Sequence, residues 1–298
     1  MTRVIAVTGG KGGTGKTFLA VNLAYLLGSN AKTLLVDADV DNPCTRTFLN
    51  TRPVSRVSIS EFRPKISSRK CKLCGLCVQN CPEHALLMIP GRNVVLMPQL
   101  CAGCGVCKIV CPFDAIEESR VEAGAIEHYD GVFDGRLDSV IGELKPTTRR
   151  TAVMILKTLN HVKKKMNNYD YVVIDAPAGT GSGIYAVMNF SEVIVAVTEP
   201  TRLGLMDLKK LYKLYERMEN EKKMFVIINK HGLRGEIFGE VEEFLRKSGL
   251  EWWSIPYDKN VVEAYVKGSV LVKDYPKTPS AVSIKKISEE LLENIRGD

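Results

Sequence analysis

The chain of 298 residues lacks any apolar run approaching the ~18 residues that a membrane-spanning helix requires. Its first ten residues, MTRVIAVTGG, predict a strand and a turn rather than a signal peptide. Histidine is scarce, and the four histidines show no ligand spacing. No cysteine follows Cys111. We therefore expect a cytoplasmic protein without a membrane anchor, whose cysteines are not joined in disulfides because the cytosol is reducing.

Eight of the nine cysteines form two copies of one pattern. The copies are CKLCGLCVQNCP at 71–82 and CAGCGVCKIVCP at 101–112, each of the form C-x2-C-x2-C-x3-C-P. This run resembles the ligand run of ferredoxins that hold two [4Fe–4S] clusters, in which the fourth cysteine of each run ligates the other run's cluster. The similarity continues beyond the cysteines, from PEHALLM to PFDAIEE, and indicates an internal duplication.

The ferredoxin resemblance implies two sets of four ligands. Three cysteines spaced two residues apart can place three thiolates on one cubane, and the fourth must come from elsewhere. Structural zinc would call for pairs of ligands rather than two quartets that end in proline, so we interpret the pattern as two clusters. The first would be held by Cys71, Cys74, Cys77 and Cys111, and the second by Cys81, Cys101, Cys104 and Cys107.

Net charge gives no reason to expect a nucleic-acid partner, and we expect none. The formal charge of +7 counts the cysteines as neutral. Two oxidised all-cysteine clusters would each add about −2, which leaves roughly +3. This excess is too small to indicate binding to nucleic acid.

A glycine-rich loop opens the chain between a predicted strand at 3–8 and an apolar helical pattern that continues through Leu26. The loop reads GGKGGTGKT, and strand, loop and helix are the context that a phosphate-binding loop requires. Backbone amides and the helix N-terminus would both face the phosphates of ATP or ADP. Lys16 is expected at the β- and γ-phosphates, and the Thr17 hydroxyl at Mg²⁺. The expected ATP contacts here are Gly10, Lys11, Gly12, Gly13, Thr14, Gly15, Lys16 and Thr17.

The extra lysine of this loop, Lys11, makes KGGTGKT resemble the deviant Walker A motif of the MinD, Mrp and nitrogenase-iron-protein superfamily of P-loop ATPases. In that family the extra lysine reaches across a nucleotide-sandwich dimer to the partner's ATP. The resemblance therefore implies a nucleotide-dependent homodimer in which Lys11 acts with Lys16.

Further family marks follow along the chain. A predicted strand at 33–36 leads into DADVDNP, and another at 171–174 leads into DAPAG. By the resemblance, Asp39 orients or deprotonates the attacking water, and Gly179 senses the γ-phosphate. The resemblance places Thr17, Asp37 and Asp175 at the Mg²⁺ site. Asn229 and Pro256 match positions that contact adenine in the family.

The order of these segments predicts an α/β fold. Strands are expected at 193–197, 225–228 and 252–255, with helices between them, which indicates a doubly wound, mostly parallel sheet. The cysteine runs lie between the two acidic motifs. We therefore expect a P-loop ATPase domain at 1–62 and 119–298, interrupted by a small α+β domain of bacterial ferredoxin type at 63–118.

Three functions fit these features. The first, which we favour, is an ATPase that hydrolyses ATP to ADP and phosphate and couples nucleotide state to electron transfer through both clusters to an unidentified redox protein. The second is assembly or delivery of iron–sulfur or other metal cofactors to an accepting protein. Scaffolds of that kind use a C-x-x-C in the later half of the chain, which this sequence lacks because no cysteine follows Cys111. The third is MinD-like spatial positioning, but the segment SIKKISEELLENIRGD mixes lysine with several glutamates and resembles an ordinary surface helix. Cys44 lies outside both runs, near the first acidic motif. A labile ligand or a redox sensor is the alternative there, but we expect a small buried thiol.

Overall fold

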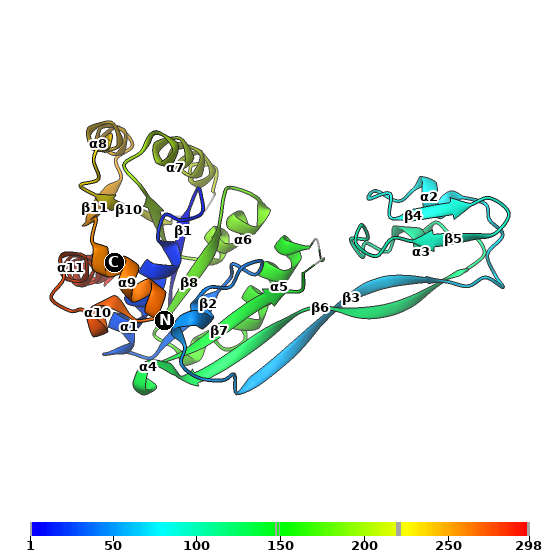
Figure 1. The fold of residues 1–298 in the computed structure, drawn as a ribbon, viewed down its shortest axis with the longest axis horizontal. Coiled ribbons are helices and arrows are strands. Elements are labelled where there is room, and N and C mark those ends of the chain that lie inside the picture. Colours follow the sequence, from blue (N-terminus) through cyan, green and yellow to red (C-terminus); the bar gives the residue numbers. More distant parts are fainter. Residues whose placement is uncertain (1, 147, 149, 219–221, 297–298) are drawn as a thin grey trace. The chain divides into compact units, whose positions relative to one another are not determined.

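The computed structural model describes residues 2–146, 148, 150–218 and 222–296, which fall into two compact units (Figure 1). The first unit is formed by Met1–Arg56, Glu127–Gly142 and Ala152–Asp298, and the second by Val57–Ile126 and Glu143–Thr151. The second unit covers more of the chain than the insert predicted at 63–118. The strands that lead into and out of it are long, and the end of a third strand joins them.

The main sheet has, among the described residues, nine strands in the order β11-β10-β9-β1-β8-β2-β7-β6-β3. Neighbours from β11 through to β7 pair in parallel, which confirms the predicted mostly parallel α/β sheet. The carboxyl ends of these strands therefore meet at one edge of the sheet. The strands are β1 (Arg3–Gly9), β2 (Thr33–Asp37), β3 (Ser55–Ile66), β6 (Ile116–Gly131), β7 (Leu137–Leu144), β8 (Tyr171–Ala178), β9 (Val193–Thr198), β10 (Lys223–His231) and β11 (Glu251–Pro256).

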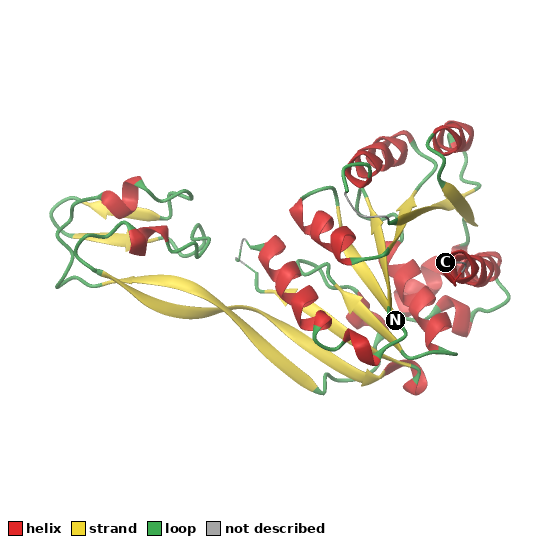
Figure 2. Cartoon of the chain, turned by 180° about the vertical axis from the view of Figure 1, so that it is seen from behind, coloured by secondary structure: helices red, strands yellow, loops and turns green. Residues whose placement is uncertain are grey.

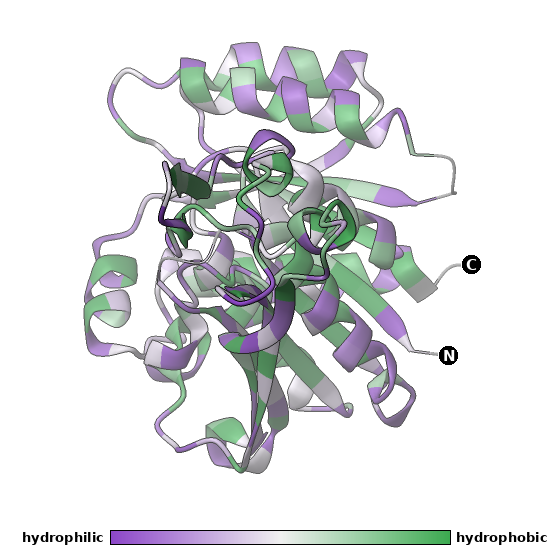
Figure 3. Cartoon of the chain, turned by 90° about the vertical axis from the view of Figure 1, so that its right-hand side faces the viewer, coloured by the Kyte–Doolittle hydropathy of each residue, from purple (hydrophilic) through white to green (hydrophobic). Residues whose placement is uncertain are grey.

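Helices pack on both faces of this sheet (Figure 2). Ile5 and Val7 alternate with Ala6 along β1, so they face the same side, where they join a core with α1, α10 and α11. Helix α7 buries an apolar stripe of Leu205, Leu208 and Leu211, and the two helices at the top of Figure 3, α7 and α8, are banded in green and purple. The helices of this unit are α1 (Lys16–Gly28), α4 (Val132–Gly135), α5 (Thr151–Lys163), α6 (Ser182–Phe190), α7 (Arg202–Tyr215), α8 (Phe238–Lys247), α9 (Lys259–Lys267), α10 (Leu271–Asp274) and α11 (Pro279–Arg296), with 3-10 turns at Thr45–Phe48 and Met166–Asn168.

The last helix, α11, packs against α1 and β11 within the first unit. Ile284, Ile287 and Leu291 lie in the same core as α1, so the apolar face of α11 is already covered. Among the described helices, none is long and apolar enough to cross a membrane.

The second unit is built around the cysteine runs. Along the chain, an antiparallel pair of strands, β4 (Leu86–Ile89) and β5 (Asn93–Leu96), lies between two one-turn helices that contact each other, α2 (Leu76–Gln79) and α3 (Val106–Ile109). Its small core contains the aliphatic residues Leu86, Val94 and Ile116 together with two cysteines, Cys77 and Cys107. Thiols therefore make up part of the hydrophobic interior of this unit.

Candidate functional site

A cleft of about 450 Å³ lies in the first unit at the carboxyl ends of the parallel strands. Its floor is the glycine-rich loop and the start of α1, and its walls include Asp39 after β2 and Ala178 at the end of β8. The structure thus brings together segments that lie far apart in the sequence. The predicted residues that line this cleft are Gly12, Gly13, Gly15, Lys16, Thr17, Asp39, Asn229 and Pro256.

Gly10, Lys11 and Thr14 of the loop do not line the cleft. They contact a smaller hollow against β9 and α7. Gly179 has a φ of 109°, which favours glycine, and its amide donates to the Gly9 carbonyl at 3.2 Å. The amide of Gly179 is therefore held beside the loop.

The loop is braced from β10. Gly15 has a φ of 97°, and a Cβ there would collide with the Asn229 amide group. The Nδ2 group of Asn229 donates to the Thr14 carbonyl at 2.8 Å, and its Oδ1 accepts from the Lys230 amide at 2.9 Å. Both polar atoms of Asn229 are thus used within the chain. Contact of this residue with adenine stays a prediction.

Lys16 is buried, and its Nζ donates to the Lys11 carbonyl at 3.0 Å. Burial lowers the pKa of Lys16, while the nearby carboxylates of Asp175 and Asp39 act in the opposite direction. An ammonium group in this position lies beside the loop amides where the phosphates are expected. It would gain in binding an anion because few water molecules reach it.

Asp37, at the end of β2, organises the segment that follows it. Its Oδ2 accepts from the Thr45 amide at 3.0 Å and from the Thr45 hydroxyl at 2.6 Å, and its Oδ1 accepts from the Asp39 amide at 3.0 Å. Burial raises the pKa of Asp37 to about 7, although these hydrogen bonds act to lower it. Asp37 therefore fixes the backbone from Asp39 to Thr45.

Asp175, on the neighbouring strand β8, is buried without such partners. Neither of its carboxylate oxygens has a hydrogen-bond partner among the described residues. Burial, and then the charge of Asp37, raise the pKa of Asp175 well above its usual range, opposed by the nearby Thr17 hydroxyl and Lys16. Two orphaned oxygens beside the loop fit a hard cation such as Mg²⁺, which prefers oxygen ligands.

Asp39 reaches the cleft itself. Burial raises the pKa of its carboxyl, as does Asp41, while Lys16 opposes the shift. A carboxylate with a raised pKa that faces a cleft can accept a proton or orient water there.

Sequence reasoning missed Glu199, which follows strand β9. The Lys11 Nζ lies 2.7 Å from Glu199 Oε2, and the Lys230 Nζ lies 2.5 Å from Oε1. Although burial favours the neutral acid, hydrogen bonds from both lysines lower the pKa of Glu199. The available signal was an acid directly after the buried apolar run 193–197 and Thr198, much as Asp37 and Asp175 follow buried apolar runs.

Cys44 lines the cleft and is half-buried, so the expectation of a buried thiol is only partly correct. Burial raises the pKa of Cys44, and Asp37, Asp39 and Asp175 add to the shift. The group is therefore a neutral thiol at neutral pH rather than a reactive thiolate.

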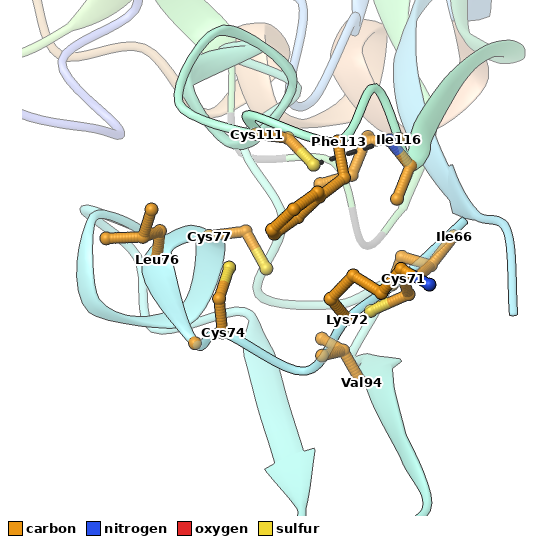
Figure 4. A pocket seen from close by; sticks show the side chains of 12 residues that line it. Ile66, Cys71, Lys72, Cys74, Leu76, Cys77, Val94, Cys111, Phe113 and Ile116 are labelled. Carbon is orange, nitrogen blue, oxygen red and sulfur yellow. Dashed lines mark hydrogen bonds between the residues drawn. The ribbon is translucent and has the colours of Figure 1, made fainter.

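The eight remaining cysteines gather around two hollows of the second unit, four at each. Figure 4 shows the first hollow with its four sulfur atoms and Phe113. All eight are free, and no disulfide joins them. The first hollow is lined by Cys71, Cys74, Cys77 and Cys111, and the second by Cys81, Cys101, Cys104 and Cys107.

The two hollows repeat in backbone detail. The turn before α2 has Leu73 and Gly75 at φ 54° and 79°, and the turn before α3 has Gly103 and Gly105 at 64° and 79°. The Ala85 amide donates to Cys81 Sγ at 3.3 Å, and in the other run the Ala115 amide donates to Cys111 Sγ at the same distance. Each fourth cysteine therefore has a backbone donor, as thiolates bound to iron commonly do.

The donor set fits cubane clusters. Among the described residues, no group of three or more His, Cys, Asp or Glu side chains could hold a single metal ion. Four thiolates that bind four different irons are further apart than four ligands of one ion. The fit to a cluster therefore rests on the grouping of four sulfurs around each apolar hollow.

Comparison with known proteins agrees with the geometry of the first unit. Residues 5–272 match the family model described as the CobQ/CobB/MinD/ParA nucleotide binding domain. An uncharacterised protein of Methanocaldococcus jannaschii is 31% identical over 91% of each chain. An iron–sulfur cluster carrier protein of Aquifex aeolicus is 26% identical over 98% of this chain and 68% of its own. The crystal structure of the cell division ATPase MinD of Pyrococcus furiosus superposes with a TM-score of 0.61 at 20% identity, over 98% of this chain and 99% of that one, and shares the fold.

Proposed function

This chain belongs to the CobQ/CobB/MinD/ParA nucleotide-binding family, and we propose that it couples the nucleotide state of this ATPase to electron transfer through two [4Fe–4S] clusters. The observation that carries the proposal is the grouping of eight cysteines around two hollows, four at each. The unit that holds them leaves the ATPase after Asp39 and returns before Asp175. Along the chain, that unit therefore lies between two residues that are expected to respond to the γ-phosphate.

The ATPase residues divide the work of hydrolysis between them. Lys16 binds the β- and γ-phosphates, and Asp39 orients the attacking water from the cleft wall. Asp175 and Thr17 would hold Mg²⁺, which neutralises phosphate charge when bound. Asp37 was predicted to serve Mg²⁺ as well, but both of its carboxylate oxygens accept hydrogen bonds from the Asp39–Thr45 segment. The role we propose for Asp37 is therefore to fix the backbone of that segment.

In the second unit, the chain's own groups would hold the clusters and tune them. The eight cysteines supply thiolates, and the Ala85 and Ala115 amides donate to two of them. Hydrogen bonds to cluster sulfur raise the reduction potential because they stabilise the added negative charge. When bound, the clusters would supply one-electron chemistry to a redox partner that remains to be identified.

We propose further that ATP closes a homodimer in which Lys11 reaches the partner's nucleotide. The position of Lys11 at the margin of the loop, outside the cleft of its own chain, supports this assignment.

Replacing Asp39 with alanine should preserve ATP binding and reduce the rate of hydrolysis by about 100-fold or more, because only the orientation of water is lost. Binding is measured with a fluorescent ATP analogue and hydrolysis by phosphate release. The matched control is Asp41→Ala in the same acidic segment, which should hydrolyse ATP at close to the normal rate. Equal loss of ATP binding in the Asp39 variant would show that Asp39 has a different role.

Coupling is tested by potentiometry on the cluster-loaded protein. We expect the midpoint potentials to differ between the ADP-bound chain and the Asp39→Ala chain trapped with ATP. A coupling free energy of about 1–3 kcal/mol corresponds to roughly 40–130 mV for one electron. The control repeats the ATP titration in the Lys16→Ala background, where no shift should occur. Identical potentials and exchange rates in the apo, ADP and ATP states would reject gated electron transfer.

A second candidate is delivery of iron–sulfur clusters to an acceptor protein. It is favoured by the similarity to the iron–sulfur cluster carrier protein of Aquifex aeolicus. The two functions differ in what leaves the chain: electrons in the first, iron and sulfide in the second. Transfer of labelled iron to an apo-ferredoxin during ATP hydrolysis would favour delivery.

A further inference from the structure

The side chain of Lys11 is held within its own chain by Glu199. The contact is an ion pair of 2.7 Å, and the Lys11 side chain is only 29% exposed. Glu199 itself is buried, so water screens this pair less than it screens a surface pair. A Lys11 that pairs with Glu199 cannot at the same time contact a nucleotide in another subunit.

Glu199 has a second cation, Lys230. The Lys230 Nζ contacts the other carboxylate oxygen of Glu199 and also donates to the Gly13 carbonyl at 2.8 Å. Lys230 has a φ of 61°, an unfavourable conformation for lysine, which its contacts with Asn229 and Glu199 must offset. The glycine-rich loop is therefore tied to β10 through Lys230 and to the segment after β9 through Glu199.

Because Glu199 pairs with two lysines, Lys11 can move away without leaving the buried Glu199 carboxylate unpaired. If Lys11 departs, Glu199 keeps Lys230 as its counter-ion, so the carboxylate does not become unpaired. The Lys11 backbone responds to nucleotide as well, because its carbonyl accepts from the Lys16 Nζ at 3.0 Å. Phosphate that recruits Lys16 would remove that hydrogen bond and loosen Lys11.

We infer that Glu199 is a positioning residue that holds Lys11 in the nucleotide-free chain and releases it, with Lys230 taking over the charge, when ATP drives dimer closure. This inference rests on the proposed function, in which Lys11 acts in trans. By this inference, the Glu199 carboxylate sets the ATP concentration that is needed for dimerisation. Loss of that carboxylate should lower this concentration, and loss of Lys230 should raise it.

The first measurement is made without nucleotide. Acetylation of Lys11 by a water-soluble active ester, followed by mass spectrometry, reports how accessible its amine is. In Glu199→Gln the Lys11 amine should react roughly twofold to fivefold faster, which corresponds to losing an ion pair of up to about 1 kcal/mol. In Lys230→Met it should react more slowly, because Glu199 then keeps Lys11 as its counter-ion and no longer shares its charge with Lys230. Glu192→Gln is the matched control: Glu192 precedes β9, pairs with Arg3 at 3.2 Å and lies at the other end of that strand.

The second measurement is the ATP concentration at which half of the protein is dimeric, followed by light scattering in the Asp39→Ala background. Glu199→Gln should lower this concentration and Lys230→Met should raise it. Because the two variants shift the midpoint in opposite directions, a general loss of folding in either one cannot mimic the result. Equal Lys11 labelling in the parent protein and Glu199→Gln would overturn the inference. Faster labelling with no dimer in any variant would support the holding role of Glu199 while rejecting the ATP-closed dimer of the proposed function.

Discussion

Replacing Lys16 with alanine is expected to remove nearly all ATP binding. The Lys16 ammonium is buried and lies beside the loop amides, so its contact with phosphate would be charge-assisted and poorly screened. Losing one partner of such a pair costs about 2–5 kcal/mol, which weakens binding roughly 30-fold to several thousand-fold. Isothermal titration of the variant with Mg-ATP measures this loss.

The matched control for that prediction is Lys11→Ala, the other lysine of the same loop. Lys11 lies outside the cleft and pairs with Glu199, so its removal should leave ATP binding by the monomer largely intact. It should abolish the ATP-dependent dimer instead. If both variants bound ATP equally well, the phosphate contacts would have to come from the loop backbone alone.

Anaerobically prepared protein is expected to contain about eight iron atoms and eight acid-labile sulfides per chain, because each quartet of cysteines fits one [4Fe–4S] cubane. Cys111→Ser alters a residue of the first hollow only. It should therefore reduce both contents by up to about half and leave the spectrum of the other cluster in place. Iron and sulfide analysis with electron paramagnetic resonance of the reduced protein distinguishes the two clusters.

Cys44→Ser provides the control for the cluster prediction. Cys44 lies at the nucleotide cleft of the first unit and lines neither hollow, so its replacement should leave iron and sulfide unchanged. Protein that carried one zinc per quartet and no sulfide would contradict the cluster assignment. So would an equal loss of iron in Cys44→Ser and Cys111→Ser.

The mostly parallel sheet and the nucleotide-binding family could be predicted from the sequence because their signals are local. A buried β-rich run, the glycine-rich loop and an apolar helix follow one another within the first 28 residues, and short-range spacing suffices to define a phosphate-binding loop. The two cysteine quartets could also be predicted from local spacing, because the same C-x2-C-x2-C-x3-C-P pattern occurs twice and fixes which cysteines correspond. The boundaries of the second unit were harder to predict from the sequence. Strands β3 and β6 continue beyond the cysteine runs, and no turn residue marks where one compact unit ends.

Only the tertiary structure decided which partners the charged side chains take. Lys11 and Glu199 pair at 2.7 Å, yet they stand on β1 and β9 loops that adjoin only because the sheet places these strands side by side. Asp37 and Asp175 are register partners on the neighbouring strands β2 and β8, and each follows a buried apolar run in the sequence. Three hydrogen bonds satisfy Asp37, whereas Asp175 keeps both oxygens free of partners among the described residues. A motif specifies backbone shape over a few residues, but burial and pairing depend on what the fold brings from elsewhere, and these set the charge and role of each group.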